Sequence, residues 1–306
     1  MSPIPTEQQV LKYMETLSNW GRWGPNDQLG TMNLLTPKKT FQAVSLVKEG
    51  KTVSCARPIL FEPASDVKIP PVHIMLKNGE DAPKKGPASA GDFIGVAFHG
   101  TTITHLDSLS HMFWDGEMYN GKPASLVTAM EGAKAESIEL LHKGVVGRGV
   151  LLDIARLHGV DWMNAGEGVT PKDVEAAEEA AGLKVEAGDI LLLRTGHYKR
   201  RLVNGPSNDG NPGPQASLLP WLHDRNVAVL GSDTGNDVLP TQYPSIGSAI
   251  HHIGIVSMGI WILDNANLEE LSQACVERGR WEFLISMGPL RLQHCTGSPV
   301  NPIAVF

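Results

Sequence analysis

The 306-residue sequence predicts a single α/β domain. Three observations support this fold class. Apolar strand-like runs alternate with helix-like segments through the middle and the last third of the chain. Neither an internal repeat nor an interdomain linker divides the sequence. Hydrophobic residues make up 42% of the chain, which is enough at this length for a sizeable buried core. We therefore expect one domain over residues 1–306.

Helices are predicted where apolar spacing coincides with capping residues. Residues 6–18 place apolar side chains three and four positions apart, with Thr6 as a candidate cap. Pro37 stands at the first helical position of a segment that runs to about Lys48. Pro171 likewise opens an Ala- and Glu-rich segment that ends at Gly182. Three more helices are expected at 217–225, from about 248 onward and at 267–278.

Strands are predicted where short apolar runs are bounded by turn residues. These runs cover 52–60, 95–107, 145–154, 188–196, 227–233, 259–264 and 283–292. Residues 62–90 are rich in Pro, Lys, Asp and Gly and predict a long surface excursion. Excursions of this length often form lids or contacts between subunits.

Composition and charge exclude several classes of protein. With 26 Lys plus Arg and 33 Asp plus Glu, the net charge is −7, which disfavours binding to nucleic acid or anionic membranes. We find no 18-residue apolar window and no apolar signal peptide, so we expect no membrane span. Three widely separated cysteines indicate a reducing compartment, and we expect a cytoplasmic protein.

Residues 98–116 carry the densest group of metal-ligand side chains. If 99–107 is a strand, His99, His105 and Asp107 share one face, and His105 and Asp107 lie about 7 Å apart. His111 follows in a loop, where it is able to face a substrate. A hydrogen-bonded His–Asp pair is the plain structural interpretation of any one of these residues. Three histidines and an aspartate within thirteen residues instead favour a metal site or an acid/base pair.

The segment THLDSLSH is similar to the signature H-x-G-T-H-x-D-x-P-x-H of the cyclase family, which contains kynurenine formamidase and the manganese-dependent isatin hydrolase. Thr104, His105, Asp107 and His111 match this signature, whereas Thr101, Ile103 and Leu109 depart from it. Flanking phrases also resemble longer family members of roughly 300 residues. These phrases are NWGRWGPNDQLGTMNLLTP, DGEMYNG, GDILLLRTG and HHIGIVSMGIWILDNANLEEL.

The resemblance implies a mixed β-core flanked by helices and a homodimer or homotetramer. It also implies that an N-terminal extension of about residues 1–50 packs on the core or on a partner subunit. His105 and Asp107 would bind zinc or manganese, with His111 near the metal. The family's second cluster, a histidine followed twelve residues later by a carboxylate, falls on His252 and Asp264. His251 is the adjacent alternative.

The first histidine of the family signature is replaced by Thr101, which is a poor zinc ligand. A catalytic metal needs about three protein ligands. His99 is the candidate for the third, but on a straight strand it lies roughly 20 Å from His105. It would reach the site only through a bend, for which Gly100 offers an opportunity. Without a metal, His111 or His252 would act as the base.

We therefore predict a hydrolase that cleaves a non-peptide C–N bond in a small cyclic or aryl amide, lactam, imide or formamide. Water activated by the metal would attack the carbonyl, and histidine would transfer the proton. Thr101, Phe113, Trp114, Trp23 and His251 are candidates for the substrate pocket. One alternative is a metal-independent family hydrolase acting on an imide, lactone or ester. The other is a non-catalytic protein that binds a small molecule.

Overall fold

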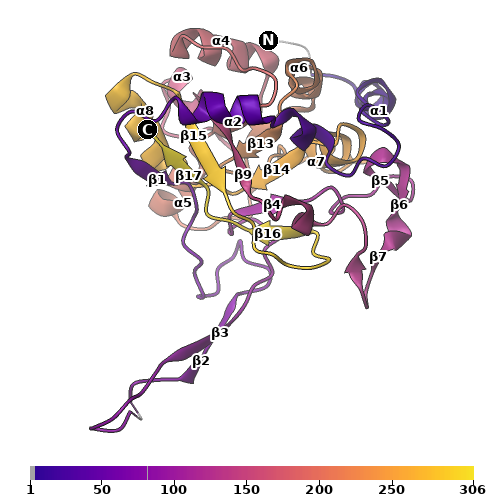
Figure 1. Cartoon of the computed structure of the whole chain (residues 1–306). Helices are drawn as coiled ribbons and strands as arrows, with labels where there is room; N and C mark the ends of the chain where they lie inside the picture. The colour runs from indigo at the N-terminus through magenta and orange to yellow at the C-terminus, as the bar shows by residue number, and fades with distance from the viewer. Residues whose placement is uncertain (1–3, 81) are drawn as a thin grey trace.

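The computed structural model describes residues 4–80 and 82–306 and contains a central nine-stranded mixed sheet (Figure 1). Four neighbouring strands are parallel: β9 (Val145–Asp153), β11 (Ile190–Arg194), β13 (Val229–Ser232) and β14 (Trp261–Asp264). Antiparallel strands flank them, with β15 (Glu282–Met287), β17 (Ile303–Val305) and β1 (Thr52–Ser54) on one side and β4 (His105–Asp107) and β16 (Gly297–Pro299) on the other. The predicted α/β class with a mixed core is confirmed.

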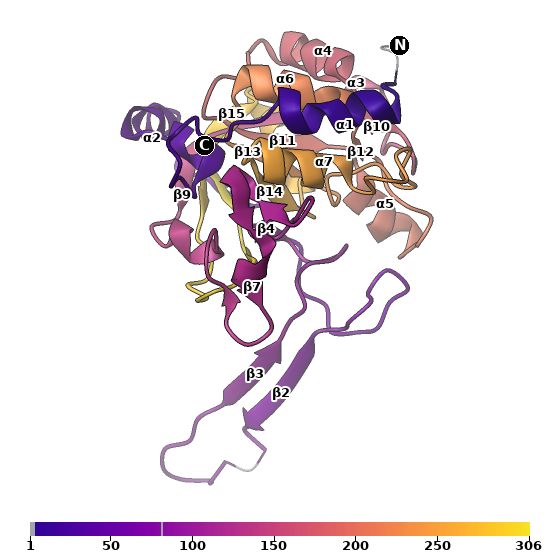
Figure 2. The ribbon, with the colours of Figure 1, turned by 90° about the vertical axis from the view of Figure 1, so that its right-hand side faces the viewer.

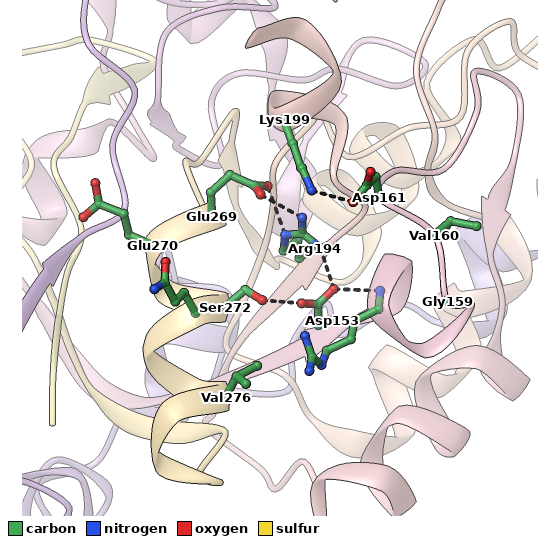
Figure 3. Close-up of a pocket in the computed structure, with 12 residues that line it drawn as sticks. Asp153, Gly159, Val160, Asp161, Arg194, Lys199, Glu269, Glu270, Ser272 and Val276 are labelled. Atoms are coloured by element: carbon green, nitrogen blue, oxygen red, sulfur yellow. Dashed lines mark hydrogen bonds and ion pairs between the residues drawn. The ribbon is translucent and has the colours of Figure 1, made fainter. Parts of the chain in front are cut away.

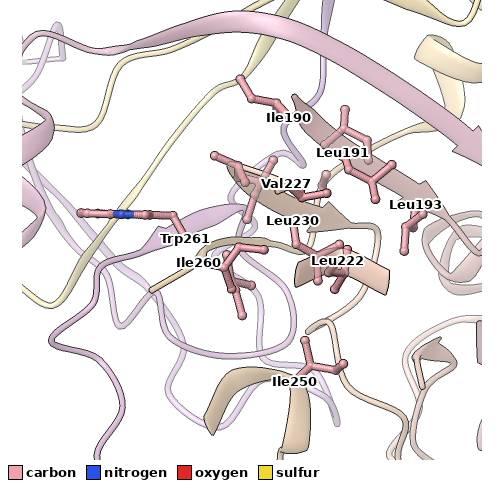
Figure 4. Close-up of a cluster of buried hydrophobic side chains, with 14 of the residues drawn as sticks. Ile190, Leu191, Leu193, Leu222, Val227, Leu230, Ile250, Ile260 and Trp261 are labelled. Carbon is pink, nitrogen blue, oxygen red and sulfur yellow. The ribbon is translucent and has the colours of Figure 1, made fainter. Parts of the chain in front are cut away.

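The central strands are apolar because they are buried on both faces of the sheet. Leu191, Leu230 and Ile262 are each 0% exposed. Helical side chains such as Leu222 and Ile250 pack against these strands (Figure 4). Each fully buried side chain of this kind stabilises the fold by about 1.5–3 kcal/mol relative to an exposed one. This core fixes the sheet whose edge carries the candidate site.

The helices follow the capping signals. A capping box between Thr6 and Gln9 begins α1, and Pro37 and Pro171 begin α2 and α4. The predicted helix from Pro37 to about Lys48 is shorter than expected and ends at Val44. The short helix α5 was not predicted, because its sequence HYKRRLVN is basic and has few apolar positions. The α-helices are α1 (Glu7–Thr16), α2 (Pro37–Val44), α3 (Ile154–Leu157), α4 (Pro171–Ala181), α5 (His197–Asn204), α6 (Leu219–Arg225), α7 (Ala249–His251) and α8 (Glu269–Arg278), and α7 continues into the π-helix η6 (His252–Ser257).

Short elements complete the fold. The 3₁₀ turns are η1 (Gly30–Leu34), η2 (Tyr119–Gly121), η3 (Ala124–Leu126), η4 (Ile138–Leu141) and η5 (Ala216–Leu218). The two-stranded pairs are β5 (Glu117–Met118) with β6 (Lys122–Pro123), β7 (Val127–Thr128) with β8 (Gly132–Ala133), and β10 (Gly168–Val169) with β12 (Gly213–Pro214).

The N-terminal segment packs on the end of η6 and the residues that follow it. The Asn19 side-chain amide donates to the Met258 carbonyl at 2.8 Å, and the Trp20 indole N–H donates to the Val256 carbonyl at 2.7 Å. The backbone N–H of Thr31 donates to the Gly259 carbonyl at 2.9 Å. These contacts tie the first fifty residues to the segment that carries His251.

The surface excursion is a long hairpin that projects from the body of the protein (Figures 1 and 2). It consists of β2 (Val72–Lys77) and β3 (Gly91–Gly95). The predicted strand over 95–107 is wrong: β3 ends at Gly95, the chain is irregular over 96–104, and only His105–Asp107 forms β4. Over the described residues, we find no helix both long and apolar enough to cross a bilayer.

Candidate metal and catalytic site

Asp107 lies at the centre of the candidate site, on the short strand β4. This strand is held between β14 and β16, and its register pairs His105 with Asp264. Because alternate strand residues share a face, the side chains of His105 and Asp107 point to the same side. The Asp107 carboxylate is completely buried. Both of its oxygens lack a hydrogen bond of acceptable geometry to the described residues.

The backbone fixes the orientation of His105. Its Nδ1 lies 2.8 Å from the Ile103 carbonyl, which accepts a hydrogen bond and therefore requires the proton on Nδ1. Nε2 then faces the carboxylates, 3.4 Å from Asp107 Oδ1 and 3.8 Å from Asp264 Oδ2. These separations are too long for hydrogen bonds. They suit ligands of one ion, since two ligands each about 2.1 Å from a tetrahedral ion lie about 3.4 Å apart.

A bend after His99 brings this residue into the site. The Asn265 side chain donates to the Gly100 carbonyl at 2.6 Å, and the Arg57 guanidinium donates to the Thr101 carbonyl at 3.0 Å. With the chain held in this way, His99 Nδ1 lies 2.9 Å from Asp107 Oδ1. The bend for which Gly100 offered an opportunity is present, and His99 is not held at the roughly 20 Å separation that a straight strand would impose.

His111 lies at the solvent side of the site, in the loop after β4. Its ring stacks on His99, with the ring centroids 3.9 Å apart and the planes 3° from parallel. His111 Nε2 is 3.9 Å from Asp107 Oδ2. The side chains of His99 and His111 are 27% and 25% exposed, so they are the members of the group that solvent or a small molecule reaches.

His251 enters the site from the other side, at the end of α7. Its Nε2 lies 3.4 Å from Asp107 Oδ2 and 3.4 Å from Asp264 Oδ2. Its Nδ1 lies 2.6 Å from Asp237 Oδ2, and Asp237 also accepts from the backbone N–H of Ile250 at 2.8 Å. A carboxylate on one imidazole nitrogen fixes the tautomer and aims the other nitrogen, as is typical of metal-site histidines.

His252 turns away from the two carboxylates. Its Nδ1 lies 2.9 Å from the Ser248 carbonyl, and its ring meets Trp114 edge-on with 5.9 Å between centroids. Consecutive residues of a helix point about 100° apart, so only one of the two adjacent histidines faces the site. The structure brings His251, rather than His252, together with Asp264.

The charges of the site are strongly coupled. Burial opposes ionisation of Asp107, but the imidazoles of His111 and His105 hold its pKa well below the usual range. Burial lowers the pKa of His111 to about 4, against the attraction of Asp107. Burial also works against a charged His251, yet Asp264 and its neighbouring carboxylates raise the pKa of His251 well above the ordinary value. In the absence of an ion, a neutral imidazole therefore faces solvent and a cationic one lies inside.

Two sets of side chains have donor atoms close enough to hold one ion. His105, Asp107 and Asp264 form a fully buried set, and His99, Asp107 and His111 form a set nearer to solvent. Both mix imidazole nitrogen with carboxylate oxygen, the combination found in zinc and manganese sites. The unpartnered oxygens of Asp107 fit the same interpretation, because a buried carboxylate without hydrogen bonds is costly unless a cation compensates it. The residues present therefore fit a divalent metal.

The predicted pocket residues lie at different distances from this group. Thr101 donates to the Asp66 carbonyl at 2.6 Å, away from Asp107. Trp114 contacts the ring of His252, and Phe113 is 40% exposed beside His111 in the sequence. Trp23 lies under the guanidinium of Arg22, 4.6 Å from the ring centroid.

Sequence reasoning missed a contribution from the loop after β13. The Asn236 side chain donates to Asp264 Oδ1 at 2.8 Å, so Oδ2 is left to face the histidines. From the sequence alone, the phrase GSDTGND after an apolar strand indicates only that Asp233 and Asp237 line a pocket or form a turn. Nothing in the spacing identifies Asn236, because its role depends on which strand lies beside β13.

A separate cavity of about 710 Å³ lies at the carboxyl ends of β9 and β11 (Figure 3). Arg194 lies there between Asp153, at 2.8 Å, and Glu269, which it contacts through two bonds of 2.7 and 3.0 Å. Lys199 contacts Asp161 at 2.5 Å. Because these charged groups compensate one another, we interpret the network as a structural cross-link between α8 and the sheet.

Comparison with known proteins shows which family this chain resembles in sequence and fold. Residues 45–236, more than half of the chain, match the family model described as Putative cyclase. The crystal structure of a novel cyclase is 32% identical, with a TM-score of 0.86 over 95% of this chain and 100% of that chain.

Isatin hydrolase A from Labrenzia aggregata is similar in fold, at 22% identity and a TM-score of 0.59 over 86% of this chain and 97% of that chain. A predicted metal-dependent hydrolase from Bacillus stearothermophilus is also similar, at 17% identity and a TM-score of 0.52 over 83% and 97%. A search of curated proteins gave no match.

Proposed function

This chain belongs to the cyclase family, and from that premise we propose that it is a metal-dependent hydrolase. The proposed reaction cleaves a C–N bond outside peptides, in a small cyclic or aryl amide such as a lactam, imide or formamide. Similarity to isatin hydrolases and to metal-dependent hydrolases supports the general class of reaction. The substrate class is our inference from the resemblance of the segment THLDSLSH to the signature of this family.

One observation carries the proposal: the buried, unpartnered carboxylate of Asp107 lies among four imidazoles. His99, His105, His111 and His251 each place a ring nitrogen within 4.0 Å of it. A structural aspartate in a protein interior would be saturated by hydrogen bonds. A buried aspartate surrounded by imidazole nitrogens is typical of a metal site.

His105, Asp107 and Asp264 are the residues that would hold the ion, with zinc and manganese as the candidates. When bound, a divalent cation supplies Lewis-acid stabilisation of charge and a water of lowered pKa. The chain's part is to hold these three side chains in place. The Ile103 carbonyl orients His105, and the Asn236 amide orients Asp264.

His111 and His251 are the groups that we assign to proton transfer. His111 is at the solvent side, where its Nε2 is placed to accept the proton of the attacking water. His251 is held by Asp237, with Nε2 directed into the site, where it would donate a proton to the leaving nitrogen. One O–H bond and the C–N bond break, one C–O bond and one N–H bond form, and exchange with solvent returns the proton from His111 to His251. The products are a carboxylic acid and an amine, or a carboxylic acid and an amide where the substrate is an imide.

The test combines metal binding with turnover. Protein stripped of metal by a chelator is titrated with Zn²⁺ or Mn²⁺ in a calorimeter, and turnover of formanilides, isatin-like lactams and lactones is then measured. We expect one ion per chain and hydrolysis of a C–N bond that is lost with the metal. Asp107→Asn should abolish both signals, while Asp209→Asn on an exposed loop should change neither.

Two outcomes would replace the proposal. Turnover of lactones or imides that survives complete metal removal would indicate a metal-independent hydrolase. Metal-replete protein that turns over no member of the panel would indicate a binding protein.

A further inference from the structure

We propose that Thr296, the residue directly before β16, is a positioning residue for the two histidines at the solvent side of the site, His99 and His111. The inference deepens the proposed function and rests on it, because it explains how the group assigned to accept the proton of water is held. His99, to which that assignment gives no part in the reaction, is the link between Thr296 and His111.

The ring of His111 makes no hydrogen bond to the described residues. Its ion-pair contact, from Nε2 to Asp107 Oδ2, is 3.9 Å long, which is too long for a hydrogen bond. The ring instead stacks on His99 with 3.9 Å between the centroids, whereas the His251 ring is edge-on and 6.3 Å away. Because a catalytic base needs a fixed orientation, the position of His111 depends on what holds His99.

His99 is contacted at both of its ring nitrogens. Nδ1 lies 2.9 Å from Asp107 Oδ1, and Nε2 lies 2.9 Å from the hydroxyl oxygen of Thr296. A hydroxyl both donates and accepts, so Thr296 pairs with Nε2 in either tautomer of the imidazole. The two contacts fix the plane of the His99 ring, and the stack extends this constraint to His111.

The backbone next to Thr296 is shaped to admit the His99 ring. Gly297 is buried and pairs with Asp107 in the register of β16 and β4. A Cβ at Gly297 would lie 2.8 Å from His99 Cε1 and 3.0 Å from Phe98 Cε2. Glycine at this position therefore lets the imidazole lie directly against the start of β16, within reach of the Thr296 hydroxyl.

Thr296 also holds the loop that carries His111. Its carbonyl accepts from the backbone N–H of Ser108 at 2.9 Å and from the Ser108 hydroxyl at 2.8 Å. The Ser108 hydroxyl is 2.8 Å from that of Ser110, and the Ser108 carbonyl accepts from the His111 N–H at 3.0 Å. Thr296 thus constrains His99 through its side chain and the loop of His111 through its backbone.

Substitution of the side chain separates these two constraints. Thr296→Val removes the hydroxyl but keeps the branched shape and the backbone bonds to Ser108. Thr296→Ser keeps the hydroxyl. Because the His99 side chain is 27% exposed, water is able to reach the ring in the valine variant, so the fold should be retained. The two variants therefore differ in how the imidazole is held.

The first measurement does not require activity. Metal-free protein is treated with diethyl pyrocarbonate at neutral pH, and the carbethoxylation rate of each histidine is followed by peptide mass spectrometry. Thr296→Val should raise the rates at His99 and His111 at least about 5-fold, because Nε2 of His99 loses its partner and the stack loosens. Thr296→Ser should stay within about 2-fold of the wild type.

Three other histidines serve as internal references. His105 and His251 are buried in the same site, and His142 is exposed far from it in the sequence. All three should keep their wild-type rates in the valine variant. General loosening of the fold would accelerate His105 and His251 as well, so these rates distinguish positioning from stability.

The second measurement is the kinetics of the panel substrate that the wild type hydrolyses fastest. Thr296→Val should lower kcat about 10–100-fold, the loss typical of an outer-sphere group. KM should change less than about 3-fold, because the base rather than substrate binding is disturbed. Thr296→Ser should recover most of kcat. Thr40→Val, which removes a partly buried hydroxyl bond of 3.1 Å to the Val146 carbonyl, should match the wild type in both assays.

Several results would overturn the proposal. Unchanged labelling of His99 and His111 in Thr296→Val is one, and a serine variant that behaves like the valine variant is another. Faster labelling with wild-type kcat would show that the position of the pair does not matter to the reaction. If the wild type hydrolyses no member of the panel, the proposed hydrolase fails, whereas the labelling rates still decide whether Thr296 holds the stacked pair.

Discussion

Asp237 and His251 form a buried carboxylate–imidazole pair in which Oδ2 and Nδ1 are 2.6 Å apart. The opposite nitrogen of the same ring lies 3.4 Å from both Asp107 and Asp264. Asp237 therefore decides which nitrogen of His251 faces the candidate metal site. Because backbone N–H groups also hold Asp237, the pair couples the start of α7 to the chemistry at the sheet edge.

Replacing Asp237 by Asn should weaken the site without emptying it. The amide is unable to stabilise an imidazolium, and its orientation no longer selects the tautomer of His251. Loss of such an outer-sphere carboxylate typically lowers metal affinity or activity 10–100-fold. We expect a fall of this size in kcat/KM and in Mn²⁺ affinity by calorimetry. Asp209→Asn, on an exposed loop, serves as the control, and an unchanged kcat/KM in D237N would contradict the role.

The adjacent histidines give a sharper comparison. His251→Gln should lower kcat/KM at least 100-fold, because this ring contacts Asp107, Asp237 and Asp264. His252→Gln should lower it less than about 5-fold, since His252 is bound to the Ser248 carbonyl and faces Trp114. Steady-state kinetics on both variants tests the assignment. If H252Q has the lower kcat/KM of the two variants, His252, which the twelve-residue spacing to Asp264 indicates, is the functional histidine.

Local sequence patterns predicted the sheet and part of the candidate site, but they did not identify which of the two adjacent histidines faces it. The sheet was predictable because β9, β11, β13 and β14 are apolar runs, which only strands buried on both faces require. His105 and Asp107 were predictable as neighbours because alternation along a strand is a local rule. The choice between His251 and His252 was not predictable, because it depends on how α7 passes into the π-helix η6.

The position of His99 shows the same limit. Its approach to Asp107 depends on Asn265 and Arg57, which hold the carbonyls of Gly100 and Thr101 from distant parts of the chain. Gly100 indicated that a bend was sterically possible, but its direction is set by tertiary contacts. Local patterns therefore identified the candidate ligands, and the fold alone determined which of them meet.

A second buried acid predicts a pH dependence of stability. Glu136 is fully buried, and burial raises its pKa to about 9, with Lys122 opposing the shift and Asp27 adding to it. The unfolded chain releases this proton near pH 4.5, while the folded chain keeps it until about pH 9. The contribution of Glu136 to stability is therefore complete below pH 4.5 and is lost as pH rises toward 9, by at most about 1.4 kcal/mol per pH unit.

Glu136→Gln should remove this dependence. Between pH 6 and pH 8 the free energy of unfolding of the wild type should fall by about 2 kcal/mol more than that of the variant. Urea unfolding at the two pH values measures the difference, and Glu175→Gln on the exposed face of α4 is the control. Parallel changes in wild type and E136Q over this range would show that Glu136 is ionised in the folded protein.

Alanine substitutions at two glycines with similar backbone angles distinguish the cost of backbone strain from the cost of a steric clash. Gly259 has φ +65° and Gly279 has φ +59°, so Ala at either position adopts an unfavourable left-handed conformation. A Cβ at Gly279 meets open space, whereas a Cβ at Gly259 would lie 2.5 Å from the Tyr119 ring. Gly279→Ala should therefore cost about 1 kcal/mol of unfolding free energy.

Gly259→Ala should cost at least about 3 kcal/mol, because it adds displacement of the buried Tyr119 to the same backbone strain. The Gly259 carbonyl accepts from Thr31, so this substitution should also loosen the N-terminal segment. Chemical denaturation of both variants gives the two costs, and their difference isolates the clash. Equal costs would mean that Tyr119 moves aside freely, in which case the packing of the N-terminal segment on the core near His251 is weaker than this geometry implies.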